Sequence, residues 1–196
     1  MNHRSFLSDI KTLRDRSRRH MKDGAVTPEH RADRRAIIKV LNEALATEIV
    51  CVLRYKRHQF TAKGIHGRSV AAEFAEHAAD EQGHADMIAQ RIVELGGAPD
   101  YSPASLVLRS HSEYAEGGDL PEMIEEDLVA ERVAIESYVE IIRFVGDGDP
   151  TTRRMLETIL AKEEEHAEDL SSLLEGLERR PRAASPTRPH AAKSHA

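Results

Sequence analysis

The stretch LAKEEEHAEDL, residues 160–170, interrupts an apolar helical face with charged side chains. Five apolar residues around it recur at spacings typical of one face of an amphipathic helix: Leu156, Ile159, Leu170, Leu173 and Leu177. Continued between Ile159 and Leu170, the same face falls on Glu163 and His166. A buried carboxylate is costly unless something pairs with it, so this face predicts a partner for Glu163.

The same test finds an acid on the apolar face of every long helical segment. The four acids are Glu48, Glu81, Glu131 and Glu163. Glu81 and Glu163 are each followed three residues later by a histidine, His84 and His166, which places Glu and His side by side on one face. Glu48 and Glu81 are 33 residues apart, and Glu131 and Glu163 are 32 residues apart. The chain therefore reads as two similar helix pairs, each contributing one Glu and one Glu-x-x-His.

This set of side chains predicts a buried dinuclear metal site. Four carboxylates cannot share one dry core unless cations neutralise them, and two divalent ions carry the matching charge. A metal-free hydrogen-bond network would leave that charge uncompensated. Carboxylate and imidazole ligands together suit iron or manganese, with zinc as a competitor. Two single Glu and two Glu-x-x-His motifs are also the known ligand set of di-iron and di-manganese helical bundles.

Turn and capping residues divide the chain into helices, and no segment has a strand pattern. Four long helices are expected at about 29–62, 69–95, 120–145 and 151–178, with a short helix possible in the segment 98–119. Short first and third connections make antiparallel neighbours. The middle connection is long enough to cross a bundle of roughly 39 Å. The expected fold is an all-α four-helix bundle with one long crossover between the second and third helices.

The two ends of the chain are basic, whereas the bundle is acidic. Residues 1–22 carry seven Lys and Arg against two Asp, and residues 179–196 carry five against no acid. We expect a basic N-terminal arm at 1–28 with a short helix over 4–22, a bundle domain at 29–178, and a disordered basic tail at 179–196. The ends could bind DNA phosphates through charge alone, or serve only as solubilising segments.

Composition narrows the class of protein. Hydrophobic residues make up 40% of the 196-residue chain and charged residues 32%, as in a helical protein, and Trp is absent. The single cysteine, Cys51, excludes an internal disulfide or a Cys-x-x-Cys metal site. No apolar leader and no run of about 18 apolar residues is found. We expect a cytoplasmic protein that does not insert into a membrane.

Over about residues 35–178 the chain resembles the bacterioferritin branch of the ferritin-like superfamily. Four segments look like its ligand segments in order: LNEALATE (41–48), DEQGH (80–84), DLVAE (127–131) and EEEH (163–166). The resemblance implies a fold of the ferritin-like type. It implies outer metal ligands at Glu48 and Glu131, bridging carboxylates at Glu81 and Glu163, and one nitrogen ligand per metal at His84 and His166.

The resemblance also extends to residues around the ligands. Tyr55, seven residues after Glu48, and Asp127, one turn before Glu131, match family positions. Tyr55 would orient Glu131 or donate an electron, or would simply be a core tyrosine. The implied activity is ferroxidation: each subunit binds two Fe ions (or Mn), and Fe(II) is oxidised by O2 or H2O2 for iron storage, detoxification and protection against oxidative stress.

Two departures from bacterioferritins alter the expectations. Gln82 stands where bacterioferritins carry the haem-ligating Met, so no haem is expected. The chain after Leu177 is Pro-rich and basic where those proteins have a fifth helix. A homo-oligomer that is a dodecamer or smaller, as in Dps-like proteins, is therefore favoured over a 24-mer.

Other uses of the same residues stay open at this stage. The dinuclear site could serve a rubrerythrin-like peroxidase, although the four-Cys domain of that family is missing, or a manganese catalase. The basic ends favour a DNA-protecting miniferritin. His58 and His77 could pass iron to the site or be partly exposed helix residues. Asp80 and Glu76 could nucleate mineral or simply face solvent.

Overall fold

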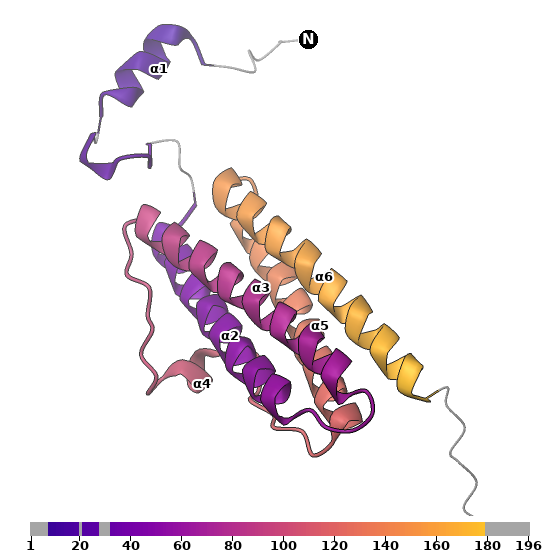
Figure 1. Ribbon diagram of the computed structural model, residues 1–196. Helices are drawn as coiled ribbons and strands as arrows, with labels where there is room; N and C mark the ends of the chain where they lie inside the picture. Colours follow the sequence, from indigo (N-terminus) through magenta and orange to yellow (C-terminus); the bar gives the residue numbers. More distant parts are fainter. Residues whose placement is uncertain (1–7, 20, 28–31, 179–196) are drawn as a thin grey trace, which may run out of the picture.

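The computed structural model describes residues 8–19, 21–27 and 32–178, and in these segments every regular element is a helix (Figure 1). Two short N-terminal elements, α1 and the 3-10 turn η1, precede four long helices and a short one. Their bounds are α1 Ile10–Ser17, η1 Met21–Asp23, α2 Arg34–Thr61, α3 Gly67–Glu94, α4 Leu106–Arg109, α5 Leu120–Val145 and α6 Pro150–Glu178.

The four long helices form the expected bundle. Helix α2 packs mainly against α3, and α5 packs mainly against α6. The connection from α3 to α5 runs along the outside of the bundle and carries α4, which packs against α2 (Figure 1). The all-α four-helix bundle with one long crossover is thus confirmed. Within the described residues, no helix is both long and apolar enough to span a bilayer.

Capping residues explain where the helices begin, and they correct three expected boundaries. Asp33 accepts hydrogen bonds from the Arg35 and Ala36 amides, so α2 starts at Arg34 rather than near 29. Asp9 caps α1 in the same way, so this helix is shorter than the expected 4–22. The helix expected from about residue 69 starts at Gly67 instead, so that Ser69 lies in the first turn of α3 and its hydroxyl donates to His66 O.

The core of the bundle has two large apolar clusters with a polar layer between them, and a third, small cluster of Ala46, Val50 and Leu106 lies where α2 meets α4. The larger cluster gathers residues near one end, among them Leu41, Ile88, Tyr138 and Ile159. The smaller cluster includes Phe74 and Leu170 and gathers near the other end. The polar layer between the two clusters is therefore shielded from water along the bundle axis, which raises the cost of any charge left unpaired there.

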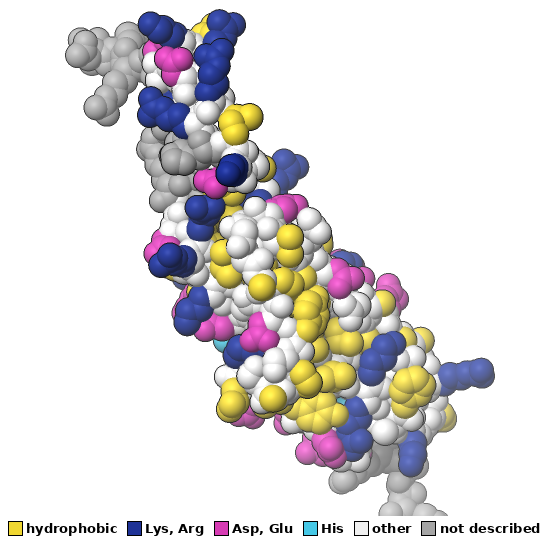
Figure 2. Space-filling model, turned by 90° about the vertical axis from the view of Figure 1, so that its left-hand side faces the viewer, with side chains coloured by type: hydrophobic (Ala, Val, Ile, Leu, Met, Phe, Trp, Pro, Cys, Tyr) yellow, Lys and Arg dark blue, Asp and Glu magenta, His cyan; other side chains and the backbone are white. Residues whose placement is uncertain are grey.

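Helix α1 takes no part in this core, since none of its residues is buried. Figure 1 draws it apart from the bundle, and Figure 2 shows Lys and Arg side chains gathered at that end of the molecule. The tail expected to be disordered, 179–196, lies outside the described residues, as does part of the arm at 1–28.

Candidate metal centre

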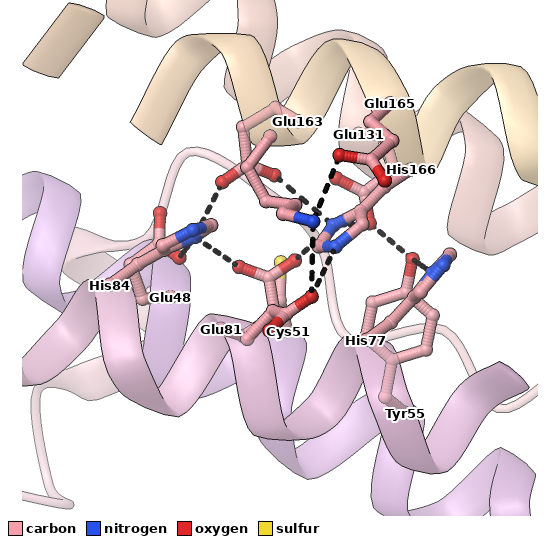
Figure 3. A network of polar contacts seen from close by, with 12 residues as sticks. Glu48, Cys51, Tyr55, His77, Glu81, His84, Glu131, Glu163, Glu165 and His166 are labelled. Carbon is pink, nitrogen blue, oxygen red and sulfur yellow. Dashed lines mark hydrogen bonds and ion pairs between the residues drawn. The ribbon is translucent and has the colours of Figure 1, made fainter. Parts of the chain in front are cut away.

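Six side chains from the four long helices meet in the polar layer. They are the six ligands expected from the sequence: Glu48 of α2, Glu81 and His84 of α3, Glu131 of α5, and Glu163 and His166 of α6. All six are buried, with at most 5% of any of them exposed to solvent. Figure 3 shows them pointing toward one another from opposite sides of the bundle. Their role as ligands stays a prediction, but the structure does bring them together.

The six residues divide into two overlapping groups of potential ligands. Glu48 and His84 belong to one group and Glu131 and His166 to the other, while Glu81 and Glu163 belong to both. In each group, one nitrogen or oxygen atom per residue lies within 4.8 Å of the corresponding atoms of the others. Because the two groups share Glu81 and Glu163, they could hold two adjacent metal ions.

The unpaired atoms of the cluster show that cations fit it. Among the described residues, buried oxygens without a hydrogen bond occur on all four Glu: Glu48 Oε2, Glu81 Oε1, Glu131 Oε2 and both oxygens of Glu163. His166 Nδ1 is also without one. Glu163 Oε1 and Glu81 Oε2 lie 2.8 and 3.3 Å from the same atom, His84 Nδ1, so one imidazole nitrogen faces two carboxylates. Buried acceptors left unpaired are costly, and metal ions are the partners that would satisfy them.

Two tyrosines orient the outer carboxylates from opposite sides. The Tyr55 hydroxyl donates to Glu131 Oε1, and the Tyr138 hydroxyl donates to Glu48 Oε1. Burial, followed by the charge of the facing Glu, raises the pKa of both tyrosines well above 10, so they stay protonated donors. Each outer carboxylate is thus held by one oxygen and presents the other to the centre.

Tyr138 is the residue that the sequence reasoning missed. The signal was nevertheless present, because Tyr138 follows Glu131 by seven residues as Tyr55 follows Glu48. Seven residues are about two helical turns, so Tyr and Glu share a face. The pairing itself is crosswise: each tyrosine serves the glutamate of the other helix pair.

Burial and neighbouring charges raise the pKa values of three groups in the cluster, so these groups hold their protons more tightly. Burial, then the charge of Glu81, raises the pKa of Glu48 to about 8. Burial, then Glu81 and Glu48, raises the pKa of Glu163 well above its usual value. Burial alone would lower the pKa of His84, but Glu163, Glu48 and Glu81 outweigh it and raise this pKa to about 12. Metal ions would displace these protons, so binding would release them.

The second half of the cluster has additional polar neighbours. His166 Nε2 lies 3.2 Å from Asp80 Oδ2, which fixes the ring with Nδ1 toward the centre. His77 stacks on the His166 ring, with centroids 4.0 Å apart, and its Nδ1 lies 3.2 Å from the Tyr55 hydroxyl. Burial and the nearby His166 lower the pKa of His77 to about 3. His77 is buried, contrary to the expectation of a partly exposed residue.

Asp127 is buried beside the centre without joining it. It accepts hydrogen bonds from Arg54 Nε at 2.8 Å, and His58 Nδ1 lies 2.7 Å from its second oxygen. His58 is therefore also buried, held at its other nitrogen by Glu116 O. Glu76, in contrast, is exposed. Gln82, at the position of the haem Met in the resemblance, is exposed and donates to Asp86.

Comparisons with known proteins agree with this architecture. A family model described as a ferritin-like domain matches residues 38–180. A bacterioferritin of Desulfovibrio desulfuricans is 32% identical over 70% of this chain and 74% of its own length. A nutrient stress-induced DNA-binding protein of a Synechococcus species is also 32% identical, over 70% of this chain and 80% of its own.

A solved structure shows the same likeness in three dimensions. It is the bacterioferritin-related protein from Bacteroides fragilis, described as a dodecameric thioferritin. It superposes with a TM-score of 0.74 and is 34% identical, covering 76% of this chain and 90% of its own.

Proposed function

The chain belongs to the ferritin-like family, and on that premise we propose that it is a di-iron ferroxidase of the bacterioferritin and Dps-like type. It would oxidise Fe(II) to Fe(III) with O2 or H2O2, for iron storage or detoxification. The observation that carries the proposal is the pair of overlapping ligand groups that share Glu81 and Glu163, with their buried unpaired oxygens.

Each residue has a distinct task in this proposal. Glu81 and Glu163 bridge the two metal positions, and Glu48 and Glu131 close them from outside. His84 and His166 each give one nitrogen ligand. Tyr138 and Tyr55 hold the outer carboxylates in place, and the two apolar clusters keep water away from the polar layer.

The reaction balances with the oxidants named. Two Fe(II) supply two electrons, which together with two protons reduce O2 to H2O2, or H2O2 to two water molecules. The protein supplies geometry and a low-dielectric site for this chemistry. Protons released from Glu48 and His84 when iron binds are available in the same layer.

The test is anaerobic titration of metal-free protein with Fe(II), followed by exposure to O2 or H2O2 and recording of ultraviolet absorbance. We expect stoichiometric binding of about two Fe(II) per chain, and fast oxidation. Glu81→Gln should lose the stoichiometric binding of two Fe(II) and the fast oxidation, whereas Glu76→Gln, an exposed residue of the same helix, should keep both. Failure to bind, or unchanged binding by Glu81→Gln, would sink the proposal. Protein purified with manganese and inert toward Fe(II) would instead favour the manganese catalase alternative.

We further propose that the chain assembles into a homo-oligomer, a dodecamer or smaller. Large apolar side chains are exposed along the outer helices of the bundle: Leu53 and Phe60 on α2, and Val129 and Phe144 on α5. Contacts between subunits would remove these side chains from water. Sizing the assembly during iron loading tests this, and uptake far beyond two Fe(II) per chain would indicate a stored mineral.

DNA binding is a second candidate function, favoured by the basic surface of α1. This short helix and its cap carry Lys11, Arg14, Arg16 and Arg18, all outside the core. Neutralising these four residues should weaken a gel shift of duplex DNA and reduce its salt dependence. If the wild-type chain gives no shift at low salt, DNA binding is ruled out as a function of this chain.

A further inference from the structure

Glu73, His77 and Asp169 form another cluster of metal-ligating side chains, outside the candidate centre. Glu73 and His77 lie one turn apart on α3, and Asp169 approaches them from α6. His77 Nε2 lies 3.6 Å from Glu73 Oε1 and 4.0 Å from Asp169 Oδ2. A first-row divalent ion holds nitrogen and oxygen ligands at about 2.0–2.2 Å, so two of its ligands stand roughly 3–4 Å apart. The cluster already has nearly this spacing.

The hydrogen bonds of His77 leave its outer nitrogen without a partner. The Tyr55 hydroxyl gives its hydrogen to Glu131, because a carboxylate can only accept. His77 Nδ1 must therefore donate to the Tyr55 oxygen, 3.2 Å away, which puts the lone pair of the imidazole on Nε2. That nitrogen belongs to a side chain only 2% exposed, and it is aimed at two carboxylates that also only accept. Three acceptors therefore face one another, His77 Nε2 and the carboxylates of Glu73 and Asp169, and a cation could bind to all three.

The cluster is open to solvent on one side and touches the candidate centre on the other. The Glu73 and Asp169 side chains are 34% and 47% exposed, so an ion can reach them from water. His77 stacks on His166, and His77, Glu131 and His166 also offer ligand atoms within 4.8 Å of one another. In Figure 3, His77 lies beside Tyr55 and His166, on the side of the centre away from His84.

We propose that Glu73, His77 and Asp169 bind a third divalent first-row metal ion, and that Fe(II) passes through this site into the buried centre. The binding of an ion is inferred from the geometry of the cluster alone, whereas the transit role rests on the proposed ferroxidase function. One imidazole and two carboxylates suit Fe(II), Mn(II), Co(II) and Zn(II). With three ligands and an open face, the site is expected to hold an ion more weakly than the buried centre does.

Anaerobic titration with Co(II), followed by visible absorbance and metal analysis, tests the binding. Glu73→Gln/Asp169→Asn should bind one Co(II) fewer per chain than the wild type. The matched control Glu76→Gln/Glu168→Gln removes the same charge from exposed positions of the same two helices, and should bind as many as the wild type. Wild-type stoichiometry in Glu73→Gln/Asp169→Asn would overturn the site.

A variant of the buried centre separates this proposal from the proposed function. Glu81→Gln/Glu163→Gln should keep one Co(II), bound at the outer cluster, and retention of none would overturn the site. A wild type that binds a single Co(II), kept in Glu81→Gln/Glu163→Gln and lost in Glu73→Gln/Asp169→Asn, would support the outer site while contradicting the dinuclear centre.

Stopped-flow oxidation of Fe(II) tests the transit role. At low Fe(II) concentration, Glu73→Gln/Asp169→Asn should oxidise iron at least about tenfold more slowly than the wild type, because it loses the charges that concentrate cations beside the centre. The amount oxidised at long times should match the wild type, since the buried ligands are intact. An unchanged rate, or an equal fall in the control Glu76→Gln/Glu168→Gln, would overturn the role.

Discussion

At the scale of single residues, the candidate centre depends on how the two oxygens of each outer carboxylate are used. Tyr138 takes one oxygen of Glu48, and Tyr55 takes one oxygen of Glu131. The second oxygen of each Glu is buried without a hydrogen bond. A carboxylate fixed in this way loses little freedom when it binds an ion, so its orientation is set before metal arrives.

Tyr138→Phe should therefore weaken the centre as much as Tyr55→Phe does. Loss of a hydrogen bond behind a ligand typically costs about 10–100-fold in metal affinity or activity. We expect a fall of at least about tenfold in the Fe(II) oxidation rate of each variant, by stopped-flow absorbance. Tyr114→Phe, in the exposed crossover, should behave as the wild type. A normal Tyr138→Phe beside an impaired Tyr55→Phe would show that the two tyrosines are not equivalent.

At the scale of helices, a buried ion pair joins α2 to α5 and to the crossover. Arg54 of α2 donates to Asp127 of α5 and, through Nη1, to Glu113 O at 2.8 Å in the connection. His58 holds the other oxygen of Asp127. Because Asp127 lies one turn before Glu131, this pairing fixes the rotation of α5 that points Glu131 at the centre.

Asp127→Ala should destabilise the bundle by about 3–5 kcal/mol, since it leaves the buried Arg54 charge without its partner. Urea unfolding of the metal-free protein measures this loss. Glu43→Ala provides the contrast, because Glu43 pairs with the exposed Lys39 and its removal should change stability little. If both variants unfold at the same urea concentration, the buried pair does not hold the two helices together.

At the scale of the whole molecule, four carboxylates and two histidines are enclosed between two apolar clusters, so folding, protonation and metal binding are coupled. The raised pKa of about 8 for Glu48 and about 12 for His84 means that the folded chain binds protons more tightly than the unfolded chain. Stability then falls as pH rises from the unfolded pKa toward the folded one.

We therefore expect metal-free protein to lose a few kcal/mol of unfolding free energy, order of magnitude, between about pH 6.5 and 8.5. The lowered pKa of His77 acts only below its ordinary value of 6.5, and that of Glu81 only below 4.5, so neither opposes the fall in this window. Urea unfolding with a chelator present measures the loss. Excess Mn(II) should reverse the trend, because binding improves as protons leave. Equal stability at both pH values would contradict the coupling.

The burial of some charged and polar residues was not predicted from the sequence, because it depends on a partner in another helix or in the crossover. Arg54 is buried although its side chain is charged, since Asp127 of another helix neutralises it. His58 and His77 are buried for the same kind of reason, each held by a residue from a different helix or from the crossover. The helical period shows which face of one helix is buried, but it does not show which residue of another helix lies opposite, so it could not identify these partners.

The amino-acid sequence by itself determined the four-helix bundle, its crossover and the six residues that converge in its core. It could do so because the 3.6-residue period states which face of each helix is buried, and because acids on every buried face demand a common neutraliser. The tertiary structure alone decided which tyrosine serves which glutamate, which histidine stacks on His166, and how Glu73, His77 and Asp169 meet. These contacts depend on the distance and rotation between helices, quantities that the period of a single helix does not contain.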